Sequence, residues 1–175
     1  VESFVLNAGG LQLDATLNGA QLPSEDLQFE IYSDTVDERG ERSLITDKIR
    51  PGQVVRLNAG TYHVVSYFGS INAKVRADLR VQPGKLTQAA MEQRGARVDL
   101  KLVSRAGGEP IANTKWSIQT ESGEEVFSSS QVQPELILAE GSYVAVAQNA
   151  STISTLQFQL QAGDEQKLEL LLEDG

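Results

Sequence analysis

The side chains best suited to bind a ligand lie on two successive segments, 62–68 and 74–81. Each segment is predicted to be a β-strand. Successive side chains of a strand point to opposite sides, so alternate residues share a face. If the two strands are neighbours, one face combines aromatic rings with cations, which suits an anionic glycan or a partner's acidic segment. The residues of this basic-aromatic face are His63, Tyr67, Lys74, Arg76 and Arg80.

A second interpretation of the same residues is purely structural. Lysine and arginine on a sheet face or edge keep the strand soluble and discourage pairing with another chain's edge. The sequence alone leaves both interpretations open.

Catalytic and metal-binding chemistry is poorly supported. A hydrolytic triad needs a base, but His63 is the one histidine, there is no cysteine, and no nucleophile-elbow motif is present. A zinc site needs three or four N, S or O ligands, which one histidine and no cysteine do not supply. No glycine-rich phosphate loop occurs. The sequence therefore predicts a non-enzymatic protein with no cofactor and no metal.

Acidic residues cluster in the segment 33–42, which invites a calcium interpretation. Calcium loops place oxygen ligands at alternate positions with a glycine at the sharp turn. Here the spacing differs and Arg39 and Arg42 interleave with the carboxylates, so a solvated turn is predicted. The acidic pairs Glu25-Asp26 and Glu124-Glu125 also fall at predicted turns.

The net charge of −9 is unevenly distributed. Residues 97–175 contain 5 Lys/Arg and 12 Asp/Glu, a net charge of −7, whereas residues 11–96 contain 10 and 11, a net charge of −1. Nucleic-acid affinity depends largely on basic contacts to phosphate, so this distribution argues against a nucleic-acid partner. No apolar run approaches the roughly 18 residues of a membrane span. The chain begins with Val1 rather than Met, and we expect that a targeting segment has been removed.

The elements that position these residues follow from an internal repeat. Leu57, Gly60, Tyr62 and Val65 recur 81 residues later as Leu138, Gly141, Tyr143 and Val146. A turn around glycine, then tyrosine and an apolar run, is typical of a tight turn leading into a half-buried strand. We therefore predict two copies of one β-unit, with residues 9–94 as the first repeat and 95–175 as the second.

Each repeat is predicted to contain seven short strands separated by turns, the pattern of a β-sandwich. Phe29 and Trp116 occupy equivalent positions 87 residues apart and are expected at the two core centres. The offset then falls to 81, so the first repeat has about six extra residues between positions 33 and 46. Where the first repeat has its basic row, the second has Thr155, Gln157, Gln159 and Gln161.

Residues 1–8 are predicted to be the last strand of a preceding repeat. The lead into the strand at Leu11 matches the lead into Val98 at a constant offset of 87, which aligns Phe4 with Met91. The linker Gln93–Ala96 is short, so neighbouring repeats of the same polypeptide are expected to follow one another closely.

Three segments of the second repeat resemble the transthyretin-like modules, namely the carboxypeptidase-regulatory-like and collagen-adhesin B-type repeats. They are the strand at Val98–Val103, the Gly108-Glu-Pro-Ile step into the strand with Trp116, and the turn at Leu138–Tyr143. The first repeat contains counterparts of the first and third of these segments. In place of the second segment it has Gln21-Leu22-Pro23.

The resemblance implies all-β, tandem, seven-stranded, Ig-like or transthyretin-like sandwiches of an exported bacterial protein in the periplasm or at the cell surface. It implies a spacer, stalk or adhesion module whose partners are proteins or cell-envelope glycan. Two alternatives remain open. One is a carbohydrate- or protein-binding module that uses the basic-aromatic face of the first repeat. The other is an accessory domain of an enzyme whose catalytic part lies outside this chain.

Overall fold

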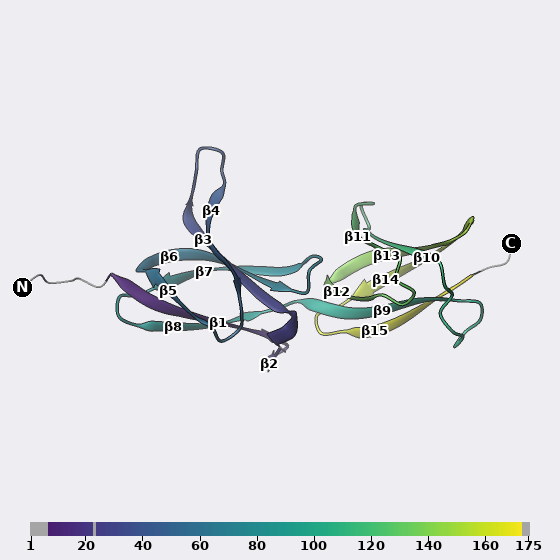
Figure 1. Cartoon of the computed structure of the whole chain (residues 1–175), viewed down its shortest axis with the longest axis horizontal. Helices are drawn as coiled ribbons and strands as arrows, with labels where there is room; N and C mark the ends of the chain where they lie inside the picture. Colours follow the sequence, from purple (N-terminus) through teal and green to yellow (C-terminus); the bar gives the residue numbers. More distant parts are fainter. Residues whose placement is uncertain (1–6, 23, 173–175) are drawn as a thin grey trace, which may run out of the picture. The chain divides into compact units, whose positions relative to one another are not determined.

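The computed structural model describes residues 7–22 and 24–172, and its regular structure is almost entirely β-strand (Figure 1). Within these ranges one short 3-10 helix, Ser24–Asp26, precedes the third strand. The first repeat contains the strands β1 (Ala8–Leu17), β2 (Ala20–Gln21), β3 (Leu27–Val36), β4 (Arg42–Ile49), β5 (Val54–Asn58), β6 (Gly60–Phe68), β7 (Ala73–Val81) and β8 (Leu86–Glu92).

The second repeat follows the same order of strands, although its described residues include no counterpart of β2. Its strands are β9 (Gly95–Val103), β10 (Thr114–Thr120), β11 (Glu125–Ser129), β12 (Glu135–Ala139), β13 (Gly141–Asn149), β14 (Thr152–Leu160) and β15 (Glu165–Leu171). The chain divides into two compact units that correspond closely to the two repeats, with residues 69–73 and 94 onward in the second unit.

Each unit is a sandwich of two sheets with the same topology. In the first, one sheet has the order β4-β3-β6-β7, and in the other β1 pairs with β2, β5 and β8. In the second, the sheets have the orders β11-β10-β13-β14 and β12-β9-β15. The first strand of each unit pairs in parallel with the last, β1 with β8 and β9 with β15, whereas neighbouring strands elsewhere, such as β3 and β6 or β10 and β13, pair antiparallel. The predicted all-β fold of two tandem sandwiches is confirmed.

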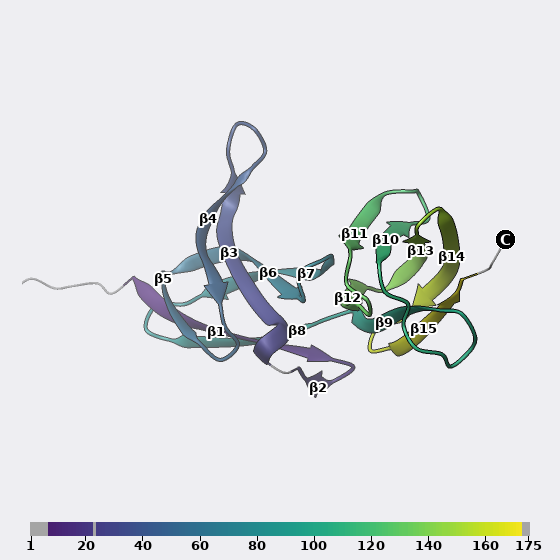
Figure 2. The same ribbon diagram turned by 45° about the vertical axis from the view of Figure 1, so that its right-hand side comes forward.

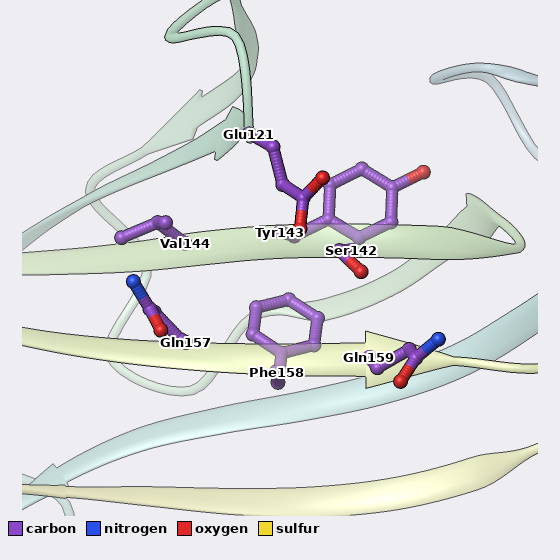
Figure 3. Close-up of a pocket in the computed structure, with 7 residues that line it drawn as sticks. All are labelled: Glu121, Ser142, Tyr143, Val144, Gln157, Phe158 and Gln159. Carbon is purple, nitrogen blue, oxygen red and sulfur yellow. The ribbon is translucent and has the colours of Figure 1, made fainter.

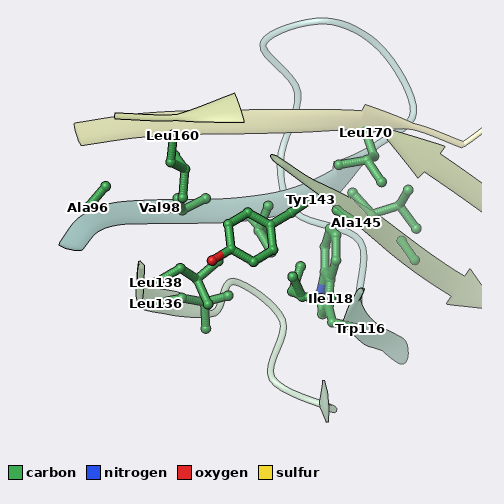
Figure 4. Close-up of a cluster of buried hydrophobic side chains, with 13 residues drawn as sticks. Ala96, Val98, Trp116, Ile118, Leu136, Leu138, Tyr143, Ala145, Leu160 and Leu170 are labelled. Atoms are coloured by element: carbon green, nitrogen blue, oxygen red, sulfur yellow. The ribbon is translucent and has the colours of Figure 1, made fainter. Parts of the chain in front are cut away.

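The core of each unit lies between its sheets and follows the period-2 pattern of the strands. Leu11, Leu13 and Ala15 of β1 are fully buried, as are Phe29 and Ile31 of β3. In the second unit the buried cluster is built from alternate residues of six strands (Figure 4). Its members are Ala96, Val98, Leu100, Leu102, Trp116, Ile118, Leu136, Leu138, Tyr143, Ala145, Ala147, Leu160 and Leu170.

In each repeat, the turn before β6 or β13 is closed by a hydrogen bond from the tyrosine hydroxyl. The Tyr62 hydroxyl donates to the carbonyl oxygen of Asn58 at 2.6 Å, and the Tyr143 hydroxyl donates to that of Ala139 at 2.6 Å. Between donor and acceptor lies a glycine with φ of 154° (Gly60) or 145° (Gly141), a backbone conformation that favours glycine. The motif that revealed the repeat therefore fixes the entry into β6 and β13.

The extra residues of the first repeat lengthen one hairpin. β3 and β4 contain 10 and 8 residues, whereas β10 and β11 contain 7 and 5. The tip is closed by Asp37, whose carboxylate accepts hydrogen bonds from the backbone N–H groups of Arg39 and Glu41, each at 2.9 Å. This hairpin projects from its sandwich (Figure 2). The acidic segment predicted as a solvated turn is thus part of an extended β-hairpin.

Several predicted boundaries differ from the structure. The sequence predicts the first strand from Leu11, but β1 begins at Ala8 because Gly9 and Gly10 continue the pairing with β5 and β8. The two-residue strand β2, which pairs with the end of β1, is not predicted by the sequence. Residues 1–6 of the segment assigned to a preceding repeat lie outside the described residues.

Candidate functional site

The basic-aromatic face requires that the strands 62–68 and 74–81 are neighbours. These strands are β6 and β7, and they lie side by side in one sheet. Exposure alternates along β7, and Lys74, Arg76 and Arg80 are all exposed. His63 and Tyr67 lie half-buried on β6. Four of the five predicted residues, all except Arg80, line one open hollow of about 640 Å³.

The hollow is formed by all four strands of the β4-β3-β6-β7 sheet. β6 contributes Val65 between His63 and Tyr67, and β7 contributes Lys74 and Arg76. Val65 is only 5% exposed and forms the floor. The remaining wall is the extended hairpin, which supplies Tyr32, Val36, Gly40, Glu41 and Arg42.

Carboxylates beside the hollow set the positions of two aromatic rings. The Tyr32 hydroxyl donates to Glu30 Oε2 at 2.6 Å. His63 Nδ1 lies 3.0 Å from Asp78 Oδ1 of β7, with side-chain exposures of 18% and 60%. The Tyr32 and His63 rings, opposite one another on β3 and β6, have centroids 6.5 Å apart and an interplanar angle of 60°. Glu30 and Asp78 are therefore already engaged.

The two tyrosines of the hollow resist ionisation. The hydrogen bond to Glu30 raises the pKa of Tyr32 far above its ordinary value, and burial adds to the increase. Burial raises the pKa of Tyr67, with a further contribution from a hydrogen bond with Glu30, while the positive charge of Arg76 acts in the opposite direction. Both phenols therefore remain neutral near neutral pH.

The hollow carries a positive charge excess. Among its lining residues, Arg42, Lys74 and Arg76 stand against Glu41, which gives three basic groups and one acidic group. In the part of the chain that the structure describes, neither Lys74 nor Arg76 forms an ion pair with a carboxylate. Lys74 and Arg76 therefore remain available to an anion.

The five lining residues of the hairpin, Tyr32, Val36, Gly40, Glu41 and Arg42, are not expected from the sequence. Tyr32 follows the buried alternation Leu27, Phe29 and Ile31, and that period-2 pattern already points its side chain outward. Its place opposite His63 depends on the pairing of β3 with β6, which the sequence does not give. Val36 and Arg42 reach the hollow only because the extra residues form paired strands rather than a loop.

The second repeat has a different surface at the equivalent positions. In the first repeat Tyr32 lies opposite His63, and the equivalent pair in the second repeat is Gln119 and Val144. In the same way, the pair Gln28 and Tyr67 is equivalent to Lys115 and Gln148. A hollow of about 460 Å³ in this unit is lined by residues of β13 and β14 together with Glu121 (Figure 3). There the rings of Tyr143 and Phe158 stack with centroids 5.7 Å apart, flanked by Gln157 and Gln159. None of its lining residues is a cation.

Residues 7–22 and 24–172 contain neither a metal-binding cluster nor a membrane-spanning helix. No group of three or more His, Cys, Asp or Glu side chains there is arranged to hold a metal ion. Among the same residues, no helix has the length and apolar character needed to cross a membrane.

The second repeat matches a known family of bacterial repeats. Residues 97–172 match the family described as the Rhizobiales growth-associated tandem repeat domain. The matched segment runs from β9 to the end of β15 and covers less than half of the chain. No curated protein matches the chain.

Several solved structures of bacterial proteins are similar to the chain at low identity. The Bacillus anthracis TIE protein is 16% identical over 95% of this chain and 34% of its own, with a TM-score of 0.39. The minor pilin GBS52 of Streptococcus agalactiae is 11% identical over 95% and 97%, with a TM-score of 0.37. The shaft pilin SpaA of Lactobacillus rhamnosus GG is 10% identical over 97% and 98%, with a TM-score of 0.36. The chain thus spans about a third of the TIE protein.

Proposed function

We propose that the chain is a pair of non-catalytic repeats from an exported bacterial protein, in the periplasm or at the cell surface. The repeats are of the transthyretin-like type, and they act as a spacer or adhesion-type module. The match of the second repeat to a tandem repeat domain of the Rhizobiales supports a bacterial repeat protein. The shared strand order of the two units supports a common structural role.

The first repeat adds a binding surface to this structural role. The observation that carries this part of the proposal is the hollow, in which His63, Tyr67, Lys74 and Arg76 meet the extended hairpin. A surface needed only for solubility has no requirement for half-buried rings beside cations. The second repeat, with the same topology, has threonine, valine and glutamine at the equivalent positions.

The test measures retention of the purified chain on a cell-envelope fraction from a bacterium of the Rhizobiales. The chain in which Tyr67 and Arg76 are replaced by the glutamines that the second repeat carries, Y67Q/R76Q, is compared with the unaltered chain. We expect the double variant to lose at least about tenfold in retention, because a charge-assisted hydrogen bond and an aromatic contact are both removed.

A charge-matched control separates the hollow from general electrostatics. Arg56 is exposed on β5, in the opposite sheet of the same unit, so R56Q makes the same change in net charge away from the hollow. R56Q is expected to bind like the unaltered chain. Equal retention of all three proteins, or no retention of any, would remove the binding surface from the proposal and leave the spacer role.

A further inference from the structure

We infer that the hollow of the first repeat binds the acidic sugars of a polysaccharide. A sugar ring lies against the aromatic side chains, and its carboxylate lies beside Lys74 and Arg76. This inference rests on the proposed binding surface and specifies its ligand. Four properties of the hollow support it: its rings, its charges, its shape and the spacing of its cations.

The rings of the hollow are fixed before any ligand arrives. Tyr32 is held by Glu30, and His63 is held by Asp78. Tyr67 is half-buried and lies opposite Gln28 in the ladder of β3 and β6. Fixed side chains lose little conformational entropy on binding. The C–H faces of a pyranose ring pack well on such aromatic surfaces, and its hydroxyls remain free for polar neighbours.

The charges of the hollow select an anionic ligand. Glu30 accepts a hydrogen bond from the Tyr32 hydroxyl, and Asp78 lies 3.0 Å from His63 Nδ1, so both carboxylates have polar partners within the chain. Lys74 and Arg76 have no carboxylate partner among the described residues. Arginine binds a carboxylate with two parallel hydrogen bonds, which a neutral sugar cannot provide.

The size of the hollow favours a small ligand over a protein partner. Protein interfaces cover about 800 Å² on each side, and a few aromatic or apolar anchors in desolvated pockets provide most of their affinity. A hollow of about 640 Å³ lies in the range of small-ligand sites, which is about 300–1,000 Å³. One or two sugar residues fit such a volume.

The cations of β7 continue beyond the hollow. Lys74, Arg76 and Arg80 are exposed on one face of the strand, where alternate residues lie about 7 Å apart. Asp78 lies between Arg76 and Arg80 on this face and contacts His63. Arg80 does not line the hollow, so it contacts only a ligand that extends along the strand. A polysaccharide with repeated carboxylates can occupy the hollow and also extend along β7. One sugar lies in the hollow, and the following sugars reach Arg80.

The experiment uses oligogalacturonates as the probe and calorimetric titration of the full chain as the measurement. Expected results are binding of the acidic oligomer, at least about tenfold weaker binding of its methyl ester, and a loss of about tenfold or more in Y67Q and in R76Q. R56Q should bind like the unaltered chain. R80Q should weaken binding of a long oligomer but leave binding of the monomer unchanged.

Each other outcome overturns the inference. Equal binding of the acid and its methyl ester would show that the carboxylate is not recognised. Binding of poly-glutamate with the same dependence on Tyr67 and Arg76 would assign the hollow to acidic peptides. Absence of oligogalacturonate binding while envelope retention still depends on Tyr67 and Arg76 would reject the ligand class alone. Loss of that dependence in the envelope experiment would reject the binding surface itself.

Discussion

At the scale of single residues, the two repeats offer natural substitutions for one another. Trp116 and Phe29 occupy equivalent core positions, and each is almost fully buried. The indole Nε1 of Trp116 is buried and has no hydrogen-bond partner among the residues that the structure describes. An unsatisfied buried donor destabilises a fold by about 1–3 kcal/mol, which offsets part of what the large ring contributes.

We therefore predict that W116F changes the free energy of unfolding by less than about 1.5 kcal/mol, since it removes the unsatisfied donor together with some apolar area. W116A should cost about 3–5 kcal/mol, the usual effect of deleting a large buried ring. Urea denaturation followed by circular dichroism measures both. A loss in W116F as large as in W116A would show that the indole has a partner or a packing role that Phe cannot replace.

The raised pKa of Tyr32 predicts that the free energy of unfolding falls at alkaline pH. Folding raises the pKa of Tyr32, so the unfolded chain loses this proton at lower pH than the folded chain does. Stability from this group is present below about pH 10 and falls as the pH rises through the ordinary tyrosine pKa. The urea midpoint should therefore decrease as the pH rises above about 10, and Y32F should show a smaller decrease. The same decrease in both proteins would contradict the assignment.

At the scale of elements, the tyrosine turn is the feature that the two repeats share most closely. The hydrogen bond from Tyr143 to Ala139 is partly buried, whereas the bond from Tyr62 to Asn58 is exposed to solvent. A carbonyl left without its partner is rehydrated easily at the surface and poorly in the interior.

Y143F should accordingly destabilise the protein by about 1–3 kcal/mol and Y62F by about 1 kcal/mol or less. Thermal unfolding monitored by calorimetry provides the comparison. Y143F also removes the hydrogen bond that the Tyr143 hydroxyl accepts from Asn72 Nδ2 at 3.0 Å, which adds to the expected loss. A larger loss in Y62F than in Y143F would show that burial does not decide the contribution of this bond.

The extended hairpin is the element that distinguishes the first repeat. Tyr32 pairs with Leu44 and Gln119 pairs with Glu125, so residues 33–43 and 120–124 are equivalent connections. Replacing residues 33–43 by 120–124 removes the wall formed by Val36, Gly40, Glu41 and Arg42.

We predict that this exchange leaves the fold intact, with a change in the free energy of unfolding of about 1 kcal/mol or less, because the shorter connection already serves the second repeat. Binding of oligogalacturonate should fall by about tenfold or more. Calorimetry reports both quantities. Unchanged binding would exclude the hairpin from the site.

At the scale of the whole molecule, the sequence predicts the two tandem units and the two faces of each strand. The 81-residue recurrence and the period-2 pattern of segments such as 74–81 are sufficient for two β-sandwiches and for the outward direction of Lys74 and Arg76. Strand order and register depend on contacts between distant segments. The neighbourhood of Tyr32 and His63, the parallel terminal strands and the exclusion of Arg80 from the hollow therefore required the structure.

The parallel pairing of the first and last strand gives each sandwich a mechanical property. Seven residue pairs join β1 to β8, from Gly10 with Leu86 to Thr16 with Glu92, and seven join β9 to β15. Because the two strands run in the same direction, tension applied to the ends of a unit slides them past one another and loads the whole ladder at once. An antiparallel terminal pair would instead open one hydrogen bond at a time.

A chain of such units is therefore suited to bear tension. In single-molecule stretching, we expect two force peaks, one for each sandwich, and a lower peak when L13P or L100P disrupts one ladder. Extension without peaks would show that the terminal ladders do not resist force.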